Sequence, residues 1–201
     1  MEPKNIDISK DEAKQYYNSG NYFNDIYKKA FEAEQFIYSN TIDPTKSCVI
    51  FDLDDTMVSE YDFMLSNDFG WPDKIMNEYF SITTFPTITE IHDLFVFCVS
   101  KKYHVVILTS RRQKYFNSTK ELIINAGYGS YSELILRPDD DEGTIQNFKK
   151  LQREKITSSG YSIICNIGDQ ESDLKDDPKS IDLPKNAIKI PNPFYLISCL
   201  I

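Results

Sequence analysis

Acidic side chains recur directly after short apolar segments of this chain. Asp52 and Asp54 follow the apolar segment 48–51, and Asp169 and Asp173 follow a later one. In an extended segment, alternate side chains point the same way, so Asp52 and Asp54 share a side. Two like carboxylates this close repel each other, and a cation or a shared proton has to offset that repulsion. A set of carboxylate oxygens suits a hard cation such as Mg²⁺, which also accepts a phosphate oxygen as a ligand.

Hydroxyl and basic side chains accompany these carboxylates. Thr109, Ser110 and Arg111 follow another apolar segment, just before a predicted helix. Hydroxyls and free backbone N–H groups at such a place can receive a phosphate. Lys149 and Lys150 lie in the predicted helix that precedes the strand before Asp169 and Asp173. Taken singly, each feature has an ordinary structural role, such as a solvated turn, a helix cap or a surface charge. Their occurrence together, each after its own buried strand, indicates one site.

Short apolar segments alternate with segments of helical periodicity. The apolar segments are typical of strands buried on both faces of a parallel sheet, and they cover 48–51, 105–108, 134–136, 163–167 and, more weakly, 187–190. The helical segments cover 88–101, 113–126 and 144–158. This alternation predicts a doubly wound α/β sheet, in which ligands bind beyond the carboxyl ends of the strands. The residues described above should therefore meet at one edge of the sheet.

The 201 residues suffice for a single domain over 1–201, with helices over 11–40 and an aromatic-rich insert over 57–86. The insert is too short for a large cap domain. Its aromatic side chains could stack on a nucleobase or an aryl group, or pack a small helical flap against the core; they are Tyr61, Phe63, Phe69, Trp71, Tyr79 and Phe80. Tyr195 near the C-terminus is a second candidate for stacking.

Charge and composition exclude several classes of protein. The formal net charge of −9 disfavours a nucleic acid polymer or an anionic membrane as a partner. The four cysteines lie far apart, which indicates free thiols, and no apolar segment is long enough to span a membrane. The first twenty residues contain no signal peptide, so we expect a cytoplasmic protein, or a secreted one if a leader has been removed.

These residues resemble the four motifs of the haloacid dehalogenase (HAD) superfamily of phosphohydrolases. The resemblance is to the acid phosphatase branch, subfamily IIIB, which contains plant vegetative-storage-type acid phosphatases, bacterial acid phosphatases and lipoprotein 5′-nucleotidases. It extends from about Tyr16 to Tyr195 and is carried by segments 51–56, 108–111, 134–138, Lys149, 160–161, 166–173 and 190–195. It implies a HAD-type, Rossmann-like sheet with N-terminal helices and a small insert in place of a cap domain.

The resemblance also implies roles for particular residues. Asp52 would be the nucleophile that forms an aspartyl-phosphate, and Asp54 would be the general acid and then the general base. Thr109 would hydrogen-bond the transferring phosphoryl group, and Lys149 would neutralise it. Mg²⁺ would be bound by Asp52, Asp169 and the backbone carbonyl of Asp54, and Asp173 would contact the ion or one of its ligands. Substrate contacts are expected from Thr109, Ser110, Arg111, Tyr61, Trp71 and Tyr195.

The expected function is Mg²⁺-dependent hydrolysis of a small phosphomonoester, such as a nucleotide or an aryl phosphate. A storage or phosphate-binding protein on the same fold, with weak or no catalysis, is the alternative, and a homodimer is left open. A response-regulator receiver domain is disfavoured, because its phosphorylated aspartate ends a later strand and its length is nearer 120 residues. The sequence is equally compatible with hydrolysis and with phosphate transfer to an acceptor alcohol.

Overall fold

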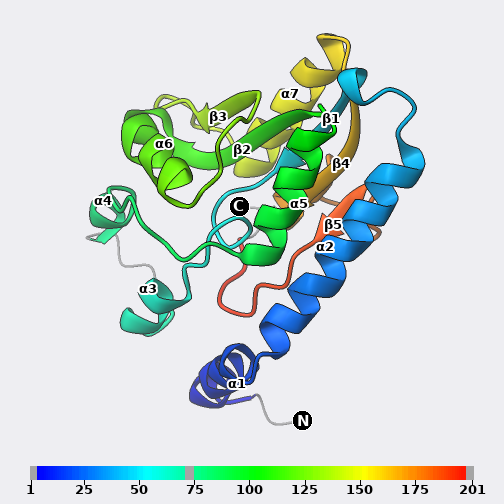
Figure 1. Ribbon diagram of the computed structural model, residues 1–201. Helices are drawn as coiled ribbons and strands as arrows, with labels where there is room; N and C mark the ends of the chain where they lie inside the picture. The colour runs from blue at the N-terminus through cyan, green and yellow to red at the C-terminus, as the bar shows by residue number, and fades with distance from the viewer. Residues whose placement is uncertain (1–3, 71–74, 198–201) are drawn as a thin grey trace.

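A single parallel sheet forms the centre of the computed structural model, which describes residues 4–70 and 75–197 (Figure 1). The strands within these residues are β1 (Ser47–Phe51), β2 (His104–Arg112), β3 (Glu133–Arg137), β4 (Ser162–Gly168) and β5 (Ala187–Lys189). Their order across the sheet is β3-β2-β1-β4-β5, and all neighbouring pairs are parallel. The predicted α/β class and each predicted strand are confirmed.

Helices cover both faces of this sheet. In the described residues they are α1 (Ile6–Asn18), α2 (Asn21–Asn40), α3 (Tyr61–Ser66), α4 (Met76–Tyr79), α5 (Thr89–Ser100), α6 (Phe116–Asn125), α7 (Ile145–Ser158) and α8 (Glu171–Leu174), with 3-10 turns η1 (Pro44–Lys46) and η3 (Gln113–Tyr115). Figure 1 shows α2 and α5 side by side in front of the sheet and α7 behind it. None of these helices is both long and apolar enough to cross a membrane.

The alternation of side chains along β1 explains why every residue after Ser47 in this strand is apolar. Val49 and Phe51 pack into the core beneath α2 and α5, whereas Cys48 and Ile50 pack into a second core with Phe148 of α7. Because both faces are covered, the strand carries no polar side chain between Ser47 at its start and Asp52 just after its end. The carboxyl end of β1 is thus the first point at which the sequence can place a charge.

Backbone geometry sets the ends of the helices. Gly20, Gly127 and Gly160 have positive φ angles of 83°, 86° and 96°, at the breaks that follow α1, α6 and α7. A glycine adopts this conformation without strain, and each of these helices ends just before one. The N-terminus of α7 is capped by Thr144, whose hydroxyl accepts the backbone N–H of Asn147. The cap fixes the start of the helix that carries Lys149.

A different glycine, Gly168, lets the chain approach itself closely at the end of β4. A Cβ atom placed on Gly168 would lie 2.3 Å from the Cβ of Asp173. The short helix α8 can therefore fold back over the strand end only because residue 168 has no side chain. This packing brings Asp173 toward the carboxyl ends of β1 and β4.

We predict that Gly168→Ala lowers the free energy of unfolding by about 1–3 kcal/mol, the usual cost of forcing an extra carbon into a packed site. The matched control is Gly129→Ala, because a Cβ at Gly129 meets nothing within 4 Å. Urea unfolding followed by circular dichroism measures both variants. Equal stability of the two would show that α8 shifts at no cost.

Candidate active site

A buried ion pair joins the ends of two strands to helix α7. The Lys149 ammonium donates to Oδ1 of Asp52 at 2.5 Å and also to Oδ1 of Asp173. All three residues are buried, with exposures of 3% for Lys149, 7% for Asp52 and 5% for Asp173. Burial opposes the positive charge of Lys149, but the two carboxylates outweigh that effect and raise its pKa above the ordinary value. Lys149 is therefore a permanent cation at the carboxyl edge of the sheet.

Asp169 completes a group of acidic residues beside this lysine. Its carboxylate accepts hydrogen bonds from Asn192 at 2.7 Å, Gln170 at 2.5 Å and the Thr56 hydroxyl at 3.3 Å. One carboxylate oxygen from each of Asp52, Asp169 and Asp173 lies within 4.8 Å of the others. The sequence expectation that these three carboxylates converge is met.

The charge balance of this group favours a bound cation. Burial, and then the neighbouring Asp173, raises the pKa of Asp52 well above its usual range, even though Lys149 acts in the opposite direction. Burial and Asp173 likewise raise the pKa of Asp169 to about 6. One lysine thus does not compensate three close carboxylates. Asp52, Asp169 and Asp173 offer only carboxylate oxygens as metal ligands, and they carry an excess of negative charge. They therefore fit a hard divalent metal ion.

A tight turn after β1 directs Asp54 to the same edge. The backbone N–H groups of Thr56, Met57 and Val58 all donate to the Leu53 carbonyl. Asp55 adopts a positive φ of 50°, which an aspartate tolerates better than most residues. This compact turn brings Asp52 and Asp54 into the lining of one small cavity.

Arg111 holds Asp54, which is a different arrangement from the expected one. The guanidinium donates from Nη2 at 2.7 Å and from Nε at 3.0 Å to the Asp54 carboxylate, and Arg111 itself is fully buried. Burial would raise the pKa of Asp54, but the charge and hydrogen bonds of Arg111 hold it below the ordinary value. Arg111 lines neither cavity at this edge, so the expectation that it contacts substrate is replaced by a contact with the predicted general acid.

The insert residues surround Arg111. The guanidinium carbon lies 5.2 Å from the Tyr79 ring centre and 5.6 Å from that of Phe80, within the range of a cation–π contact. The Tyr79 hydroxyl donates to Glu60, a fully buried residue whose carboxyl group also hydrogen-bonds Asp54. Burial, followed by the charges of Asp54 and Asp55, raises the pKa of Glu60 well above its usual range. A protonated Glu60 can therefore donate to the Asp54 carboxylate.

Two adjoining cavities open onto these residues. The small one, about 30 Å³, is lined by Asp52, Lys149, Asp169 and Asp173, while the other is about 370 Å³ and mainly apolar. Residues that line both are Asp54, Ser110, Ile145, Tyr195 and Ile197. The larger cavity is completed by Glu60, Met76, Tyr79, Phe80, Arg112 and Leu196. Asp54 therefore lies at the junction of an ionic cavity and an apolar one.

Only some of the residues predicted to contact substrate line the two cavities. Ser110 and Tyr195 line both cavities, whereas the buried Thr109 hydroxyl accepts the Arg111 backbone N–H at 3.2 Å and lines neither. Tyr61 is corrected: the residue is 4% exposed and its ring is stacked on Tyr17 with a centroid separation of 3.6 Å, so no face is open to a ligand. Trp71 lies outside the described residues.

Thr109 and Arg111 do not line the cavities as expected, because the end of strand β2 is irregular. The sequence predicts that this strand ends at residue 108, but β2 continues to Arg112, which pairs with Arg137 of β3 after a shift in register. A shift in register of this kind changes the direction in which nearby side chains point, and it is common next to active sites.

Sequence reasoning missed Glu60 and Arg112 as residues of the site. The sequence indicates Tyr79 only as a residue for stacking, and it gives Arg112 no role. A glutamate near the start of the insert, six residues after Asp54, is a signal that could have indicated Glu60. Asn192 and Gln170 belong to the motifs of the resemblance, and the structure gives them a contact, the Asp169 carboxylate.

Comparison with solved structures identifies proteins of the same fold. The chain is similar to the class C acid phosphatase from Bacillus anthracis, in a crystal structure with tungstate bound, with a TM-score of 0.75 at 17% identity over 93% of this chain and 85% of that one. A second structure of the class C acid phosphatase from Bacillus anthracis gives a TM-score of 0.72 at 17% identity. At this identity, the likeness shows the fold.

Comparison with curated proteins finds plant relatives. Acid phosphatase 1 of Solanum lycopersicum is 29% identical over 93% of this chain and 74% of its own length. Vegetative storage protein 1 of Arabidopsis thaliana is 27% identical over 84% of this chain and 63% of its own length. A family model described as HAD superfamily, subfamily IIIB (acid phosphatase) matches residues 4–198. With the fold, the carboxylate group and the buried lysine in place, this match shows that the chain belongs to the subfamily IIIB acid phosphatases of the HAD superfamily.

Proposed function

We propose that this acid phosphatase hydrolyses small phosphomonoesters through an aspartyl-phosphate on Asp52, with Mg²⁺ as cofactor. The observation that carries the proposal is the buried lysine between Asp52 and Asp173, with Asp169 in the same group. Lys149 fixes the Asp52 carboxylate, leaves its other oxygen for attack, and offers a positive charge to a phosphoryl group.

The first step transfers the phosphoryl group to the protein. A carboxylate oxygen of Asp52 forms a bond to phosphorus while the bond from phosphorus to the ester oxygen breaks. Glu60, which burial keeps protonated and which hydrogen-bonds Asp54, supplies the proton that Asp54 passes to the departing oxygen at the junction of the two cavities. Ser110 at the same junction can donate a hydrogen bond to an oxygen of the phosphoryl group as it is transferred. Lys149 offsets the charge on that group.

The second step regenerates the free carboxylate of Asp52. Asp54, now a carboxylate, takes a proton from a water molecule whose oxygen attacks phosphorus, and the bond to Asp52 breaks to release inorganic phosphate. Arg111 keeps the Asp54 carboxylate in one orientation through both steps. The metal would be held by Asp52, Asp169, Asp173 and the Asp54 backbone carbonyl. When bound, it supplies positive charge that binds phosphate oxygens and reduces repulsion among the carboxylates.

The apolar cavity supports a leaving group with an apolar, flat body. Its volume of about 370 Å³ lies within the range of small-molecule sites, and Tyr79, Phe80 and Tyr195 contribute aromatic surface. Arg112 at this cavity already donates to the carbonyls of Pro138 and Asp141, at 2.7 and 2.8 Å. An aryl phosphate or a nucleoside monophosphate fits this lining. A homodimer and a cytoplasmic or secreted location stay predictions.

A storage or phosphate-binding protein with weak catalysis is the second candidate. It is favoured by the similarity to a vegetative storage protein of Arabidopsis thaliana. The presence of Asp52, Asp54, Lys149 and Asp169 in one arrangement supports catalysis instead. The two candidates differ in a single observable, the turnover of phosphate.

We predict that Asp52→Asn reduces phosphate release by a factor on the order of 10³ or more, because an amide cannot form the covalent intermediate. The measurement is inorganic phosphate from aryl phosphates, nucleoside 5′-monophosphates and sugar phosphates between about pH 5 and 7.5 with Mg²⁺. Asp93→Asn is the control, since its side chain is 79% exposed on α5. Equal, low release by both variants and by the unmodified protein would favour the storage candidate.

We predict that Mg²⁺ raises the melting temperature more at pH 7.5 than at pH 5. The pKa of Asp169, about 6, exceeds its ordinary value of 3.8, so the metal-free protein loses stability as the pH rises through this interval and Asp169 ionises. A bound cation relieves the repulsion and contributes about 2.7 kcal/mol at a hundred times its Kd. Thermal unfolding with Mg²⁺ or EDTA tests this, and Asp169→Asn should abolish the shift. No shift at pH 7.5 would exclude a Mg²⁺ site here.

We predict that Arg111→Gln moves the alkaline limb of the pH–rate profile to higher pH for an alkyl phosphate. Without the guanidinium, the pKa of Asp54 rises, and Asp54 keeps the proton for the leaving oxygen to a higher pH. Hydrolysis of p-nitrophenyl phosphate should change less, because p-nitrophenolate departs without a proton. Arg111→Lys should retain the original limb. An unchanged limb in a folded Arg111→Gln variant would contradict the role of Arg111 in holding Asp54.

A further inference from the structure

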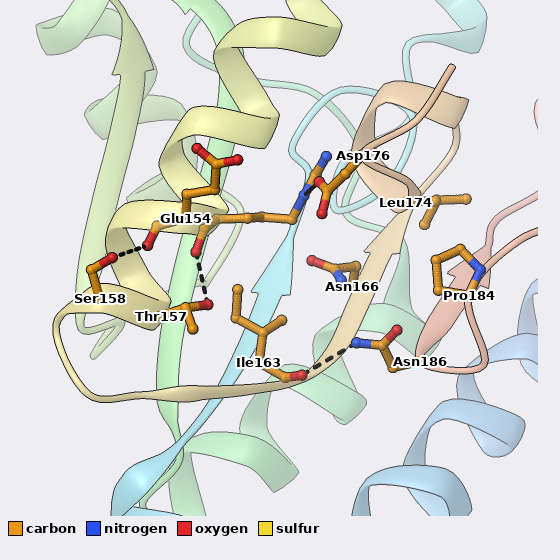
Figure 2. Close-up of a pocket in the computed structure, with 10 residues that line it drawn as sticks. Glu154, Thr157, Ser158, Ile163, Asn166, Leu174, Asp176, Pro184 and Asn186 are labelled. Atoms are coloured by element: carbon orange, nitrogen blue, oxygen red, sulfur yellow. Dashed lines mark hydrogen bonds and ion pairs between the residues drawn. The ribbon is translucent and has the colours of Figure 1, made fainter. Parts of the chain in front are cut away.

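Two cavities of similar size differ in the chemistry of their walls. One, of about 470 Å³, lies between α7, β4 and the segment before β5, and its lining is mostly polar (Figure 2). Figure 2 shows the Asn186 side chain bonded to the Ile163 carbonyl, at 3.2 Å. The cavity of about 370 Å³ beside Asp54 is mainly apolar instead. Because apolar surface in contact with water is unfavourable, this second cavity gains most from a ligand that covers it.

The polar groups of the apolar cavity that are open to a substrate gather at one end. Asp54 and Ser110 line both this cavity and the carboxylate cavity, so they lie where the phosphoryl group is transferred. Arg112 donates from Nη1 to two carbonyls of loop 138–141, at 2.7 and 2.8 Å, and these bonds hold its guanidinium against the loop. The cavity thus has a polar end for the phosphate and an apolar body for the rest of the substrate.

The aromatic hydroxyls of the lining have partners in the protein. Tyr79 donates to Glu60, which is fully buried, and the Tyr195 hydroxyl donates to the Asp55 carboxyl group. Both tyrosines therefore present ring surface to the cavity. A substrate body with hydroxyl or amide groups would lose water here without gaining partners from the described lining. Each such buried group weakens binding by a factor of about 5 to 100.

The apolar walls are fixed by contacts outside the cavity. The Phe80 ring is stacked on Tyr115 with centroids 4.8 Å apart, and the Phe80 carbonyl accepts the Ser118 hydroxyl at 2.7 Å. In the C-terminal segment, the Ile197 backbone N–H donates to Gln170 Oε1 at 2.8 Å. A cavity formed in advance binds an apolar group without the cost of ordering its walls.

The size of the cavity indicates the size of the alcohol. An apolar cavity of about 150 Å³ holds benzene, so about 370 Å³ has room for roughly twice as many carbon atoms. Leu196, which also lines the cavity, is 78% exposed, so a longer chain would cover it.

We propose that the substrate is the phosphate monoester of an apolar alcohol with about six to twelve carbons, and not a nucleotide or a sugar phosphate. This inference rests on the phosphatase activity proposed above and specifies its leaving group. Hydrolysis consumes one water molecule and releases the alcohol together with inorganic phosphate.

A series of n-alkyl phosphates tests the proposal. With Mg²⁺, and below the micelle concentration of each ester, kcat/KM should rise about two- to fourfold for each methylene added from ethyl to octyl phosphate, because each methylene leaves water for the cavity. Octyl phosphate should exceed adenosine 5′-monophosphate and ribose 5-phosphate by about tenfold or more. A higher value for the nucleotide than for octyl phosphate would overturn the proposal.

Met76→Gln tests the apolar wall with little change in side-chain length. It places an amide among the apolar side chains, so the ratio of kcat/KM for octyl phosphate to that for ethyl phosphate should fall about five- to tenfold. The matched control is Glu78→Gln in the same helix, because the Glu78 side chain is exposed and does not line the cavity. A ratio of two substrates on one preparation does not change with the fraction of folded protein. An unchanged ratio in Met76→Gln would contradict the proposal.

Ethyl phosphate separates this proposal from the phosphatase activity itself. Its leaving group is too short to cover the apolar walls, so its turnover reports the carboxylate site. Phosphate release from ethyl phosphate with no dependence on chain length would overturn the proposal and leave the phosphatase activity intact. No release from any ester would overturn both.

Discussion

Repulsion among buried carboxylates at the end of the sheet is the constraint on which the arrangement of this protein depends. Three carboxylates lie within 4.8 Å of one another, and Asp54 is close by. Left alone, such a group would favour unfolding or protonation. The protein offsets part of it with Lys149, buried to 3% exposure, and leaves the rest for a cation. In the proposed mechanism stability and catalysis are linked, because the charge that destabilises the fold is also the charge that would bind the metal ion.

The positions of the surrounding elements follow from this constraint. Helix α7 has to carry Lys149 beneath the ends of β1 and β4, and the Thr144 cap fixes where that helix begins. Helix α8 has to bring Asp173 onto the strand end, which requires that Gly168 have no side chain. The hydrogen bonds from Asn192 and Gln170 fix the Asp169 carboxylate. A phosphatase site on this fold therefore involves several separate elements, which meet only at the sheet edge.

The insert between the first two motifs serves Asp54 as much as the substrate. Aromatic residues in such a segment are usually considered for stacking on a ligand, yet Tyr79 and Phe80 lie against the Arg111 guanidinium, and Tyr79 donates to Glu60. Arg111 in turn holds the Asp54 carboxylate. The same aromatic rings form a wall of the apolar cavity. One side of the insert thus keeps the proposed general acid in place while the other is available to a leaving group.

The sequence by itself determined the fold class, the strands and the residues at their carboxyl ends, because burial on both faces requires apolar strands and permits charge only where a strand stops. It also predicted the convergence of Asp52, Asp169, Asp173 and Lys149, since parallel strands end at one edge. Only the tertiary structure decided the partners of individual side chains. Arg111 turned to Asp54 because β2 continues past its expected end with a shift in register, and Tyr61 stacked on Tyr17 because a helix far away in sequence packs there. Such contacts depend on distances between elements, which the local pattern of residues does not contain.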